Sequence, residues 1–259
     1  MSIGTLFDLR GRIALVTGGS RGLGLQIAEA LGSAGARVLL AARKAEALQQ
    51  AQAHLRALGI EADWVAADNG STEGAIAIAD AAIERCGRVD ILVNNAGASW
   101  GAPAEDHPLE AWDKVFNLNV RGLFALTQQI GKRSMIPQRH GRILNIASVA
   151  GLRGNPPGHM QTIAYNTAKG AVVNFTRALA AEWGRHGITV NALAPGFFHS
   201  RMSDALIERV GEQALVGNTP LGRLGDDEDL KGAALLFASN AGKHISGQIL
   251  AIDGGATAQ

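Results

Sequence analysis

The sequence predicts an α/β protein in which a doubly wound parallel sheet of about seven strands carries helices on both faces. Short β-branched or aliphatic runs alternate along the chain with segments of helical spacing, and clusters of Gly and Pro sit where the runs end. Most runs are apolar on both alternating faces, as strands must be when helices cover both sides of a parallel sheet. This alternation is typical of a doubly wound sheet.

Seven of these runs are expected to be strands. They are "RIALVTG" from residue 12, "RVLLAA" from 37, "ADWVAAD" from 62, "VDILVNN" from 89, "RILNIAS" from 142, "ITVNALAP" from 188 and "GQILAID" from 247. Helical spacing predicts helices over 22–35, 44–58, 71–87, about 108–134 and about 162–186. No repeat or low-complexity linker interrupts this order, so residues 1–259 are expected to form a single domain.

One segment departs from the alternation, between the sixth and seventh runs. Residues 197–225 read as a helix-bearing insertion that ends in "NTPLGRLG". Loops at the carboxyl ends of parallel strands line the ligand crevice, so this insertion is a candidate lid over a substrate.

Composition narrows the functional classes. Hydrophobic residues make up 47% of the chain and aromatic residues only 5%, so the core must be aliphatic. The net charge is +1 with no long run of one sign, which argues against nucleic-acid or anionic-membrane binding. The apolar runs are too short for a membrane span and the N-terminus lacks a signal-peptide layout, so a cytoplasmic location is expected. Cys86 is the only cysteine and the histidines show no paired ligand spacing, so neither an internal disulfide nor a metal site is expected.

The turn after the first strand has the features of a phosphate cradle. It reads "TGGSRGLG", residues 17–24, and leads directly into the apolar helix over 22–35. A helix N-terminus presents unpaired N–H groups and a partial positive charge, so it can hold a pyrophosphate where glycines let the chain approach closely. The preceding strand and the following helix are the context that this motif requires, which favours dinucleotide binding.

The end of the second strand indicates which dinucleotide is bound. An acidic residue there would bind the ribose 2′-hydroxyl of NAD, but the sequence "LLAARK" offers no carboxylate and places Arg43 at that point. Ser20 and Arg21 in the glycine turn face the same ribose. Because these groups suit a 2′-phosphate, NADP(H) is expected in preference to NAD(H).

The chain's only tyrosine, Tyr165, stands four residues before Lys169 in the helical segment from 162. Residues four apart lie on one helix face with Cβ atoms about 5–6 Å apart, so the ammonium group can act on the phenol. A free phenol has a pKa near 10 and accepts a proton poorly at neutral pH, whereas a nearby cation lowers that pKa. The pair is therefore a candidate acid/base, and we expect Tyr165 to donate the proton when a ketone is reduced.

Taken in order, the motifs resemble the short-chain dehydrogenases/reductases over nearly the whole chain. "TGGSRGLG" looks like the family's cofactor loop, "AADNG" looks like its adenine contact, and "NNAG" looks like the strand end that supports the cofactor. The segments of the family's catalytic tetrad are resembled by "NLNVRG", "NIASVAG" and "YNTAK". The resemblance implies that the tetrad is Asn119, Ser148, Tyr165 and Lys169. It implies cofactor contacts at Gly18, Ser20, Arg21, Gly22, Leu23, Gly24, Arg43, Asp68, Asn69, Asn95, Ala96, Gly97, Tyr165, Lys169, Pro195, Gly196, Phe198 and Ser200.

The family resemblance also implies a Rossmann fold, hydride transfer between a nicotinamide and a carbonyl or alcohol carbon, and usually a homotetramer. Ser148 directly follows the fifth strand, where its hydroxyl can hydrogen-bond the substrate oxygen beside the phenol. No histidine is placed by a recognisable motif to activate it, which argues against a Ser-His-Asp hydrolase. The resemblance implies that Asn119 helps to hold a water that joins Lys169 to solvent.

Two stretches depart from the family pattern and bear on the substrate. The connection "VAGLRGNPPGHMQTIA" between Ser148 and Tyr165 is several residues longer than in many members, and His159 and Met160 within it are candidate substrate contacts. After the sixth strand, Ser200 stands where threonine is usual and Phe198 is bulkier than the usual aliphatic residue. His199 lies between them and is a third candidate contact.

Three functions are consistent with these observations. The first is an NADP(H)-dependent oxidoreductase that interconverts a secondary alcohol and a ketone on a small polar substrate such as a sugar acid, because "FDLRGRIALVTGGSRGLG" is similar to gluconate 5-dehydrogenase-like members. The second is a reductase of 3-oxoacyl thioesters of acyl-carrier protein or coenzyme A. An acidic carrier would need a basic patch, for which the candidates are Arg133, Arg139, Arg142 and Arg153. The third is a non-catalytic NADP-binding sensor on the same fold, against which the intact tetrad argues.

Overall fold

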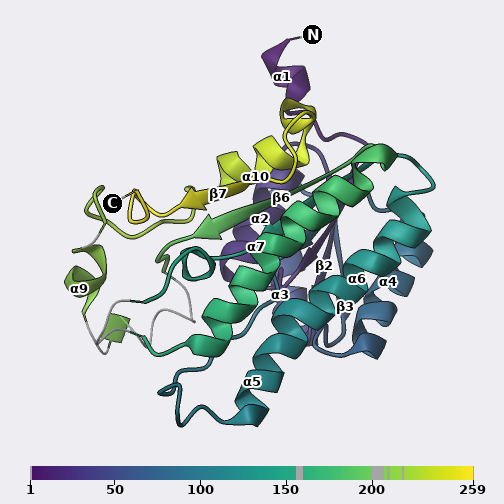
Figure 1. Ribbon diagram of the computed structural model, residues 1–259. Helices are drawn as coiled ribbons and strands as arrows, with labels where there is room; N and C mark the ends of the chain where they lie inside the picture. Colours follow the sequence, from purple (N-terminus) through teal and green to yellow (C-terminus); the bar gives the residue numbers. More distant parts are fainter. Residues whose placement is uncertain (1, 156–159, 200–206, 209–210, 218, 259) are drawn as a thin grey trace.

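The computed structural model describes residues 2–258 except 156–159, 200–206, 209–210 and 218 (Figure 1). Within these residues seven parallel strands form one sheet in the order β3-β2-β1-β4-β5-β6-β7, which confirms the predicted fold class. The strands are β1 (Ile13–Thr17), β2 (Arg37–Ala42), β3 (Ala62–Ala66), β4 (Ile91–Asn94), β5 (Gly141–Ile146), β6 (Ile188–Pro195) and β7 (Ile249–Ile252). Six of them lie within the runs expected from the sequence, and β5 begins one residue before its run, at Gly141.

The helices predicted from helical spacing are present, with one difference, and α10 is a further helix outside the predicted ranges. The α-helices are α1 (Ile3–Leu6), α2 (Gly22–Ser33), α3 (Ala45–Ala57), α4 (Thr72–Cys86), α5 (Leu109–Phe116), α6 (Leu123–Ile130), α7 (Ile163–Trp183), α9 (Glu212–Val216) and α10 (Lys231–Ala238). Short 3₁₀ turns form η3 (Val149–Gly151), η4 (Gly184–His186) and η5 (Asn240–Gly242). The expected continuous helix over 108–134 is instead α5 and α6 joined by the wider π-helical turns η1 (Asn117–Gly122) and η2 (Gly131–Met135).

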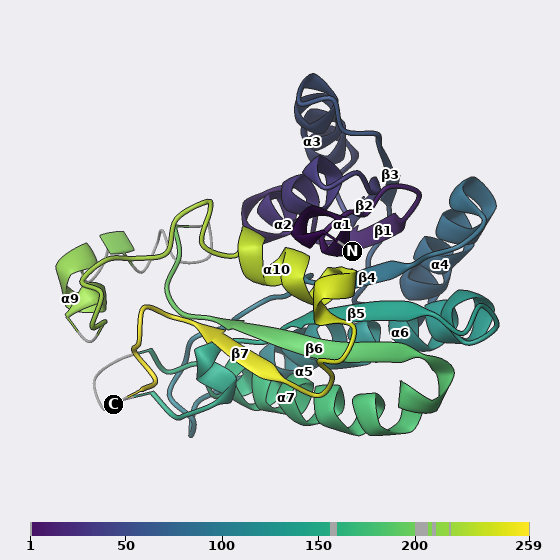
Figure 2. The same cartoon turned by 90° about the horizontal axis from the view of Figure 1, so that it is seen from above.

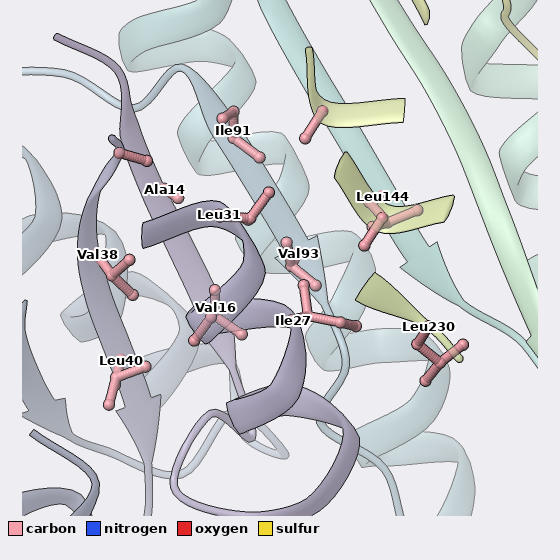
Figure 3. Close-up of a cluster of buried hydrophobic side chains, with 14 of the residues drawn as sticks. Ala14, Val16, Ile27, Leu31, Val38, Leu40, Ile91, Val93, Leu144 and Leu230 are labelled. Carbon is pink, nitrogen blue, oxygen red and sulfur yellow. The ribbon is translucent and has the colours of Figure 1, made fainter. Parts of the chain in front are cut away.

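Helices cover both faces of the sheet, and each face has its own apolar core (Figure 2). On one face α2, α3 and α10 pack over the strands, and Figure 3 shows Ile27 and Leu31 of α2 beside Val16 and Val93 of the sheet. On the other face α4, α6 and α7 contribute the buried residues Ile78, Ala79, Ala82, Leu126, Ile130 and Leu179. Burial on both sides explains why the strands read as continuous apolar runs.

A ladder of buried amides holds the carboxyl ends of β4 and β5 in register. Asn94 lies opposite Asn145, and its Nδ2 donates to Asn145 Oδ1 and to Thr127 Oγ1 of α6, both at 2.9 Å. Asn145 Nδ2 in turn donates to Thr176 Oγ1 of α7 at 2.9 Å. Because a one-residue slip would leave these buried groups unpaired, the ladder fixes where both helices sit relative to the strand ends.

Helix α2 is also tied to the chain that follows the candidate lid. Buried Gln26 donates from Nε2 to Asp227 Oδ1 at 2.6 Å, and Lys231 Nζ lies 3.1 Å from Glu29 Oε2. Phe198 and Gly225 form an isolated parallel bridge, and the Phe198 ring lies where a Cβ on Gly225 would overlap it. The segment from 199 to 224 therefore leaves and returns at neighbouring points.

None of the helices in the described part of the chain has the length and apolar character that a membrane span requires.

Candidate active site

The glycine turn after β1 exposes the N-terminus of α2. The N-cap residue Arg21 makes no side-chain cap hydrogen bond, and the first bond into the helix runs from Leu25 N to Arg21 O at 3.4 Å. The N–H groups of Gly22, Leu23 and Gly24 therefore have no partner within the helix. Their orientation and the helix dipole suit a bound pyrophosphate.

Only glycine fits at two points of this turn. Gly18 has a φ of +63°, and a Cβ there would lie 2.7 Å from Asn95 Nδ2. A Cβ on Gly24 would overlap both Asn95 Nδ2 and the Gly18 carbonyl oxygen. Gly22, at φ +52°, has no atom within 4 Å of such a Cβ, so that side of the turn is open. The turn is a close-packed cradle with one free side, and it fits a dinucleotide phosphate.

The end of β4 braces this cradle. Asn95 Nδ2 donates to the carbonyls of Thr17 and Gly18 at 2.9 and 3.2 Å. Thr17 Oγ1 accepts from the backbone N–H groups of Asn95 and Ala96 at 3.0 and 3.1 Å, and donates to Val93 O at 3.2 Å. The Asn95 side chain thus supports the glycine turn. Thr17 is not among the contacts predicted from the sequence. Its position as the first residue of "TGGSRGLG" is the feature that could have indicated its role.

The groups expected around the adenine and its ribose lie along the same edge of the sheet. Arg43 is exposed immediately after β2, and Ser20 is half-buried in the glycine turn. After β3, Asp68 Oδ1 accepts from Gly70 N at 2.9 Å, while Asn69 is buried. Asn69 Oδ1 has no hydrogen-bond partner among the described residues. A buried amide oxygen without a donor is costly, and the amino group of a bound base is a donor of the kind it lacks.

The four tetrad positions come from three elements that converge at the carboxyl edge. Ser148 caps the 3₁₀ turn η3 directly after β5, and Tyr165 lies in the first turn of α7. Lys169, one turn later and 5% exposed, places Nζ 5.6 Å from the centroid of the Tyr165 ring. A Cβ on Gly97 would lie 3.5 Å from Asn119 Oδ1 and 3.6 Å from Lys169 Nζ, so Asn119 reaches the same place from η1.

Burial, more than charge, sets the pKa values of this pair. Burial raises the pKa of Tyr165 above its ordinary value, and a hydrogen bond with Ser148 partly opposes that rise. Burial also lowers the pKa of Lys169 to about 8, and its ammonium donates to Ile146 O at 2.6 Å. The expectation that Lys169 lowers the phenol pKa is therefore wrong for these residues alone, because removal from water is the larger effect and the ammonium is directed at a carbonyl.

Asn119 is held more tightly than an ordinary helix residue. It is 1% exposed within η1, its Oδ1 accepts from Ala98 N at 2.8 Å, and its Nδ2 donates to Ala98 O at 2.9 Å. Gly122, at the end of the same turn, approaches the Asn69 carbonyl more closely than any Cβ would allow. These two contacts give the π-helical turn a physical role, since it brings both the 97–98 loop and the 68–70 loop against one helix.

The structure describes some of the candidate substrate residues and leaves others outside its described range. Met160 is half-buried, and its carbonyl accepts from Asn155 Nδ2 at 2.6 Å. His199 is exposed. His159 and Ser200 lie outside the described residues. Phe198 is buried with its ring over Gly225, so its side chain shapes the base of the 199–224 segment.

Pro195 ends β6 at the same edge, and Gly196, which follows it, donates from its backbone N to Ile252 O at 2.9 Å. A Cβ on Gly196 would lie 2.9 Å from Asp253 Cα. This close approach of two strand ends leaves room only for glycine.

Three of the four arginines proposed for a carrier-protein patch lie away from this edge. Arg142 is buried near the start of β5, Arg139 donates to Arg185 O at 3.0 Å, and Arg133 pairs with Asp80 at 2.6 Å. All three stand close to the amino end of β5, which precedes Ser148 by a strand length. Only Arg153 follows Ser148 in the loop at the carboxyl edge, so the four do not make a common patch.

The described residues hold no group of three His, Cys, Asp or Glu side chains that could bind a metal ion.

Comparisons with known proteins agree with this geometry. The sequence profile of the short chain dehydrogenases matches residues 12–211. The chain is 41% identical over 259 residues to gluconate 5-dehydrogenase of Gluconobacter oxydans, with 99% of both chains covered. It is 42% identical over 255 residues to a 3-oxoacyl-[acyl-carrier-protein] reductase of rhamnolipid biosynthesis from Pseudomonas aeruginosa, with 96% and 97% covered. A gluconate 5-dehydrogenase from Burkholderia cenocepacia, solved with NADP and tartrate, superposes with a TM-score of 0.93 at 36% identity over the full length of both chains.

Proposed function

The chain belongs to the short-chain dehydrogenase/reductase family, and from this premise we propose that it is an NADP(H)-dependent oxidoreductase of a small polar secondary alcohol or ketone, such as a sugar acid. It is an enzyme of the class that acts on CH–OH groups. The convergence of Ser148, Tyr165 and Lys169 beside an open glycine cradle is the observation that carries the proposal.

We assign the chemistry to these residues as follows. The nicotinamide cofactor, when bound, supplies or accepts the hydride. Tyr165 donates a proton to the substrate oxygen in ketone reduction and accepts it in alcohol oxidation. Ser148, already hydrogen-bonded to the phenol, holds the substrate oxygen at the same point.

Lys169 has a pKa of about 8, so near neutral pH it is close to its own titration point and can return a proton towards Tyr165. Asn119 keeps the 97–98 loop beside the ammonium group through its two bonds to Ala98. Its role is to position that loop, and any water between Lys169 and solvent is proposed to sit there.

The preference for NADP(H) over NAD(H) is part of the proposal. Arg43 is exposed directly after β2, and Arg21 is exposed at the N-cap of α2. A charge-assisted hydrogen bond contributes about 1.5–3 kcal/mol, which is at least a tenfold difference in affinity. Relatives solved with NADP support the choice, since the chain superposes on them over nearly its whole length.

A 3-oxoacyl-thioester reductase is the alternative function, and its support is the relative of that name at 42% identity. The separation of Arg133, Arg139 and Arg142 from Ser148 argues against a carrier protein that docks across all of these arginines. A non-catalytic NADP-binding sensor would have no need for the buried lysine beside the phenol, because burying an ammonium group costs stability.

Substrate profiling tests the proposal directly. Initial rates with NADPH and 5-ketogluconate, compared with acetoacetyl-coenzyme A, should favour the keto acid by about tenfold or more in kcat/KM. A higher kcat/KM for acetoacetyl-coenzyme A than for 5-ketogluconate would favour the 3-oxoacyl-thioester reductase instead. If neither substrate supports NADPH oxidation while the protein still binds NADPH, the result would favour the non-catalytic sensor.

Three further features belong to the proposal. The chain acts as one domain in which the 197–225 insertion covers the substrate, supported by the Phe198–Gly225 bridge at its base. A homotetramer is supported by the edge strand β7, whose Leu250 is 39% exposed, and by the exposed ring of Phe124 on α6. Light scattering tests the assembly. A cytoplasmic location stays a prediction from the sequence, which cell fractionation would test.

A further inference from the structure

The connection between β5 and α7 begins at one tetrad residue and ends at another. Ser148 follows β5, Tyr165 lies in the first turn of α7, and the intervening loop is the one expected from the sequence to be longer than in many family members. Any displacement of this loop is therefore passed to the pair that must hold the substrate oxygen. How the loop is fixed decides how well that pair is placed.

Asn155 fixes this loop through its side-chain amide. Asn155 Nδ2 donates to Met160 O at 2.6 Å, to Thr162 Oγ1 at 3.1 Å and, at a longer 3.4 Å, lies near Asn166 Oδ1. The Met160 bond closes the base of the insertion, and the other contacts tie that base to the start of α7. Residues 156–159, between Asn155 and Met160, lie outside the described residues.

The contacts continue to the residue next to Tyr165. Thr162 Oγ1 donates to Asn166 Oδ1 at 2.8 Å, and Asn166 Nδ2 reaches towards Arg153 O at 3.5 Å. Thr162 is 8% exposed, so its hydroxyl depends on Asn155 and Asn166 for partners. Because Asn166 follows Tyr165 directly in the helix, this ring fixes the first turn of α7 from the loop side.

The same ring is joined to the loop after β4. Ala102 and Thr162 form an isolated parallel bridge, and Ala102 N donates to Gln161 O at 2.9 Å. The 98–102 loop is in turn held by Asn119 through Ala98. Segments 98–102 and 160–162 therefore form one hydrogen-bonded wall beside the tetrad, and Asn155 holds the second of them.

We propose that Asn155 is a positioning residue that keeps Tyr165 aligned with Ser148 and sets the shape of the substrate pocket by closing the base of the insertion. The proposal rests on the proposed function for its kinetic consequence only. The observation behind it is the set of contacts from one amide group to the loop base and to the first turn of α7. Asn155 touches neither the reacting atoms nor the cofactor in this assignment.

The test uses two variants with matched controls. Asn155→Asp keeps the size of the side chain and removes the donor, and Thr162→Val removes one hydroxyl, whereas Thr162→Ser retains it. Gln161→Ala changes an exposed side chain in the same loop and serves as a control. With NADPH saturating, N155D and T162V should raise KM for the carbonyl substrate by about fivefold or more and lower kcat, while NADPH affinity stays within about twofold. T162S and Q161A should match the native enzyme.

The split between KM and kcat separates positioning from folding. A merely structural role lowers the fraction of active enzyme, which reduces kcat and leaves KM unchanged. If N155D does not fold, T162V against T162S carries the comparison. Unchanged KM in folded N155D, or equal effects of T162V and T162S, would overturn the proposal.

Hydrogen exchange makes the test independent of the substrate. In N155D the amides of residues 160–168 and 98–104 should exchange faster than in the native protein, while those of β1 and α2 are unchanged. Unchanged exchange at 160–168 would overturn the proposal even in an enzyme with the expected activity. The native protein could prove inactive towards every carbonyl substrate tested. If residues 160–168 of N155D still exchange faster, the structural role of Asn155 is supported and only the proposed function is contradicted.

Discussion

Replacing Lys169 with methionine should make the protein without cofactor more stable near neutral pH while it abolishes turnover. Lys169 is 5% exposed, and its ammonium group donates to Ile146 O. No carboxylate pairs with Lys169 in the part of the chain that the structure describes. Burial without a counter-charge lowers its pKa from 10.5 to about 8, so the folded state holds the proton less firmly than the unfolded state does.

The sign of the pH dependence follows from these two values. Below pH 8 both states carry the proton and the folded state bears the full cost of burying it, whereas between pH 8 and 10.5 only the unfolded state is protonated. Stability therefore rises with pH across that window. A shift of this size corresponds to about 3 kcal/mol in total, of which about 2 kcal/mol is regained between pH 7 and pH 9.5.

Urea unfolding of the cofactor-free protein at several pH values measures this contribution. The difference in unfolding free energy between the native protein and Lys169→Met should shrink as pH rises from 7 to 9.5, because only the native protein gains. Lys114→Met, an exposed lysine on α5, is the control and should run parallel to the native protein. Parallel curves for Lys169→Met as well would refute the idea that Lys169 is a buried, uncompensated ammonium.

Three further outcomes are expected at the site. Tyr165→Phe should lower kcat by at least about a hundredfold with NADPH affinity unchanged in a fluorescence titration, and unchanged turnover would contradict the acid/base assignment. Arg43→Asp should weaken NADPH by about tenfold or more while NADH binding is little altered, measured as the ratio of the two dissociation constants; an unaltered ratio would remove Arg43 from cofactor selection. Gly24→Ala should raise the dissociation constant of either cofactor by about tenfold, because its Cβ would overlap Asn95 Nδ2 and the Gly18 carbonyl, and native affinity would show that the turn adapts.

The parts of the site that sequence could predict are those set by local geometry. The four-residue spacing of Tyr165 and Lys169 on a helix brings them to one face, and the ammonium indeed lies over the phenol ring. The glycine turn was equally readable, because a strand, a tight turn and a helix are consecutive in the chain. Strand positions followed from apolar runs that only two-sided burial explains.

What could not be predicted depends on contacts between distant segments. The direction of the phenol pKa required knowing how much of Tyr165 is removed from water, and spacing carries no such information. The spacing of apolar residues does not predict the π-helical turn at Asn119, because this turn depends on contacts with Ala98 and Asn69. Asn155 had no signal at all, because its partners are a backbone carbonyl and side chains in a loop without periodicity.

The paired anchors at the two ends of the 199–224 segment have a consequence for how such an enzyme diversifies. The Phe198–Gly225 bridge joins the two ends of this segment, and the Gln26–Asp227 bond ties the chain that follows it to α2. Substitutions between these anchors are therefore expected to leave cofactor binding unchanged. The chain shares about two-fifths of its residues with each of two relatives, one named for gluconate and one for a 3-oxoacyl carrier-protein substrate, and we expect a change of substrate between such proteins to be accommodated between these anchors.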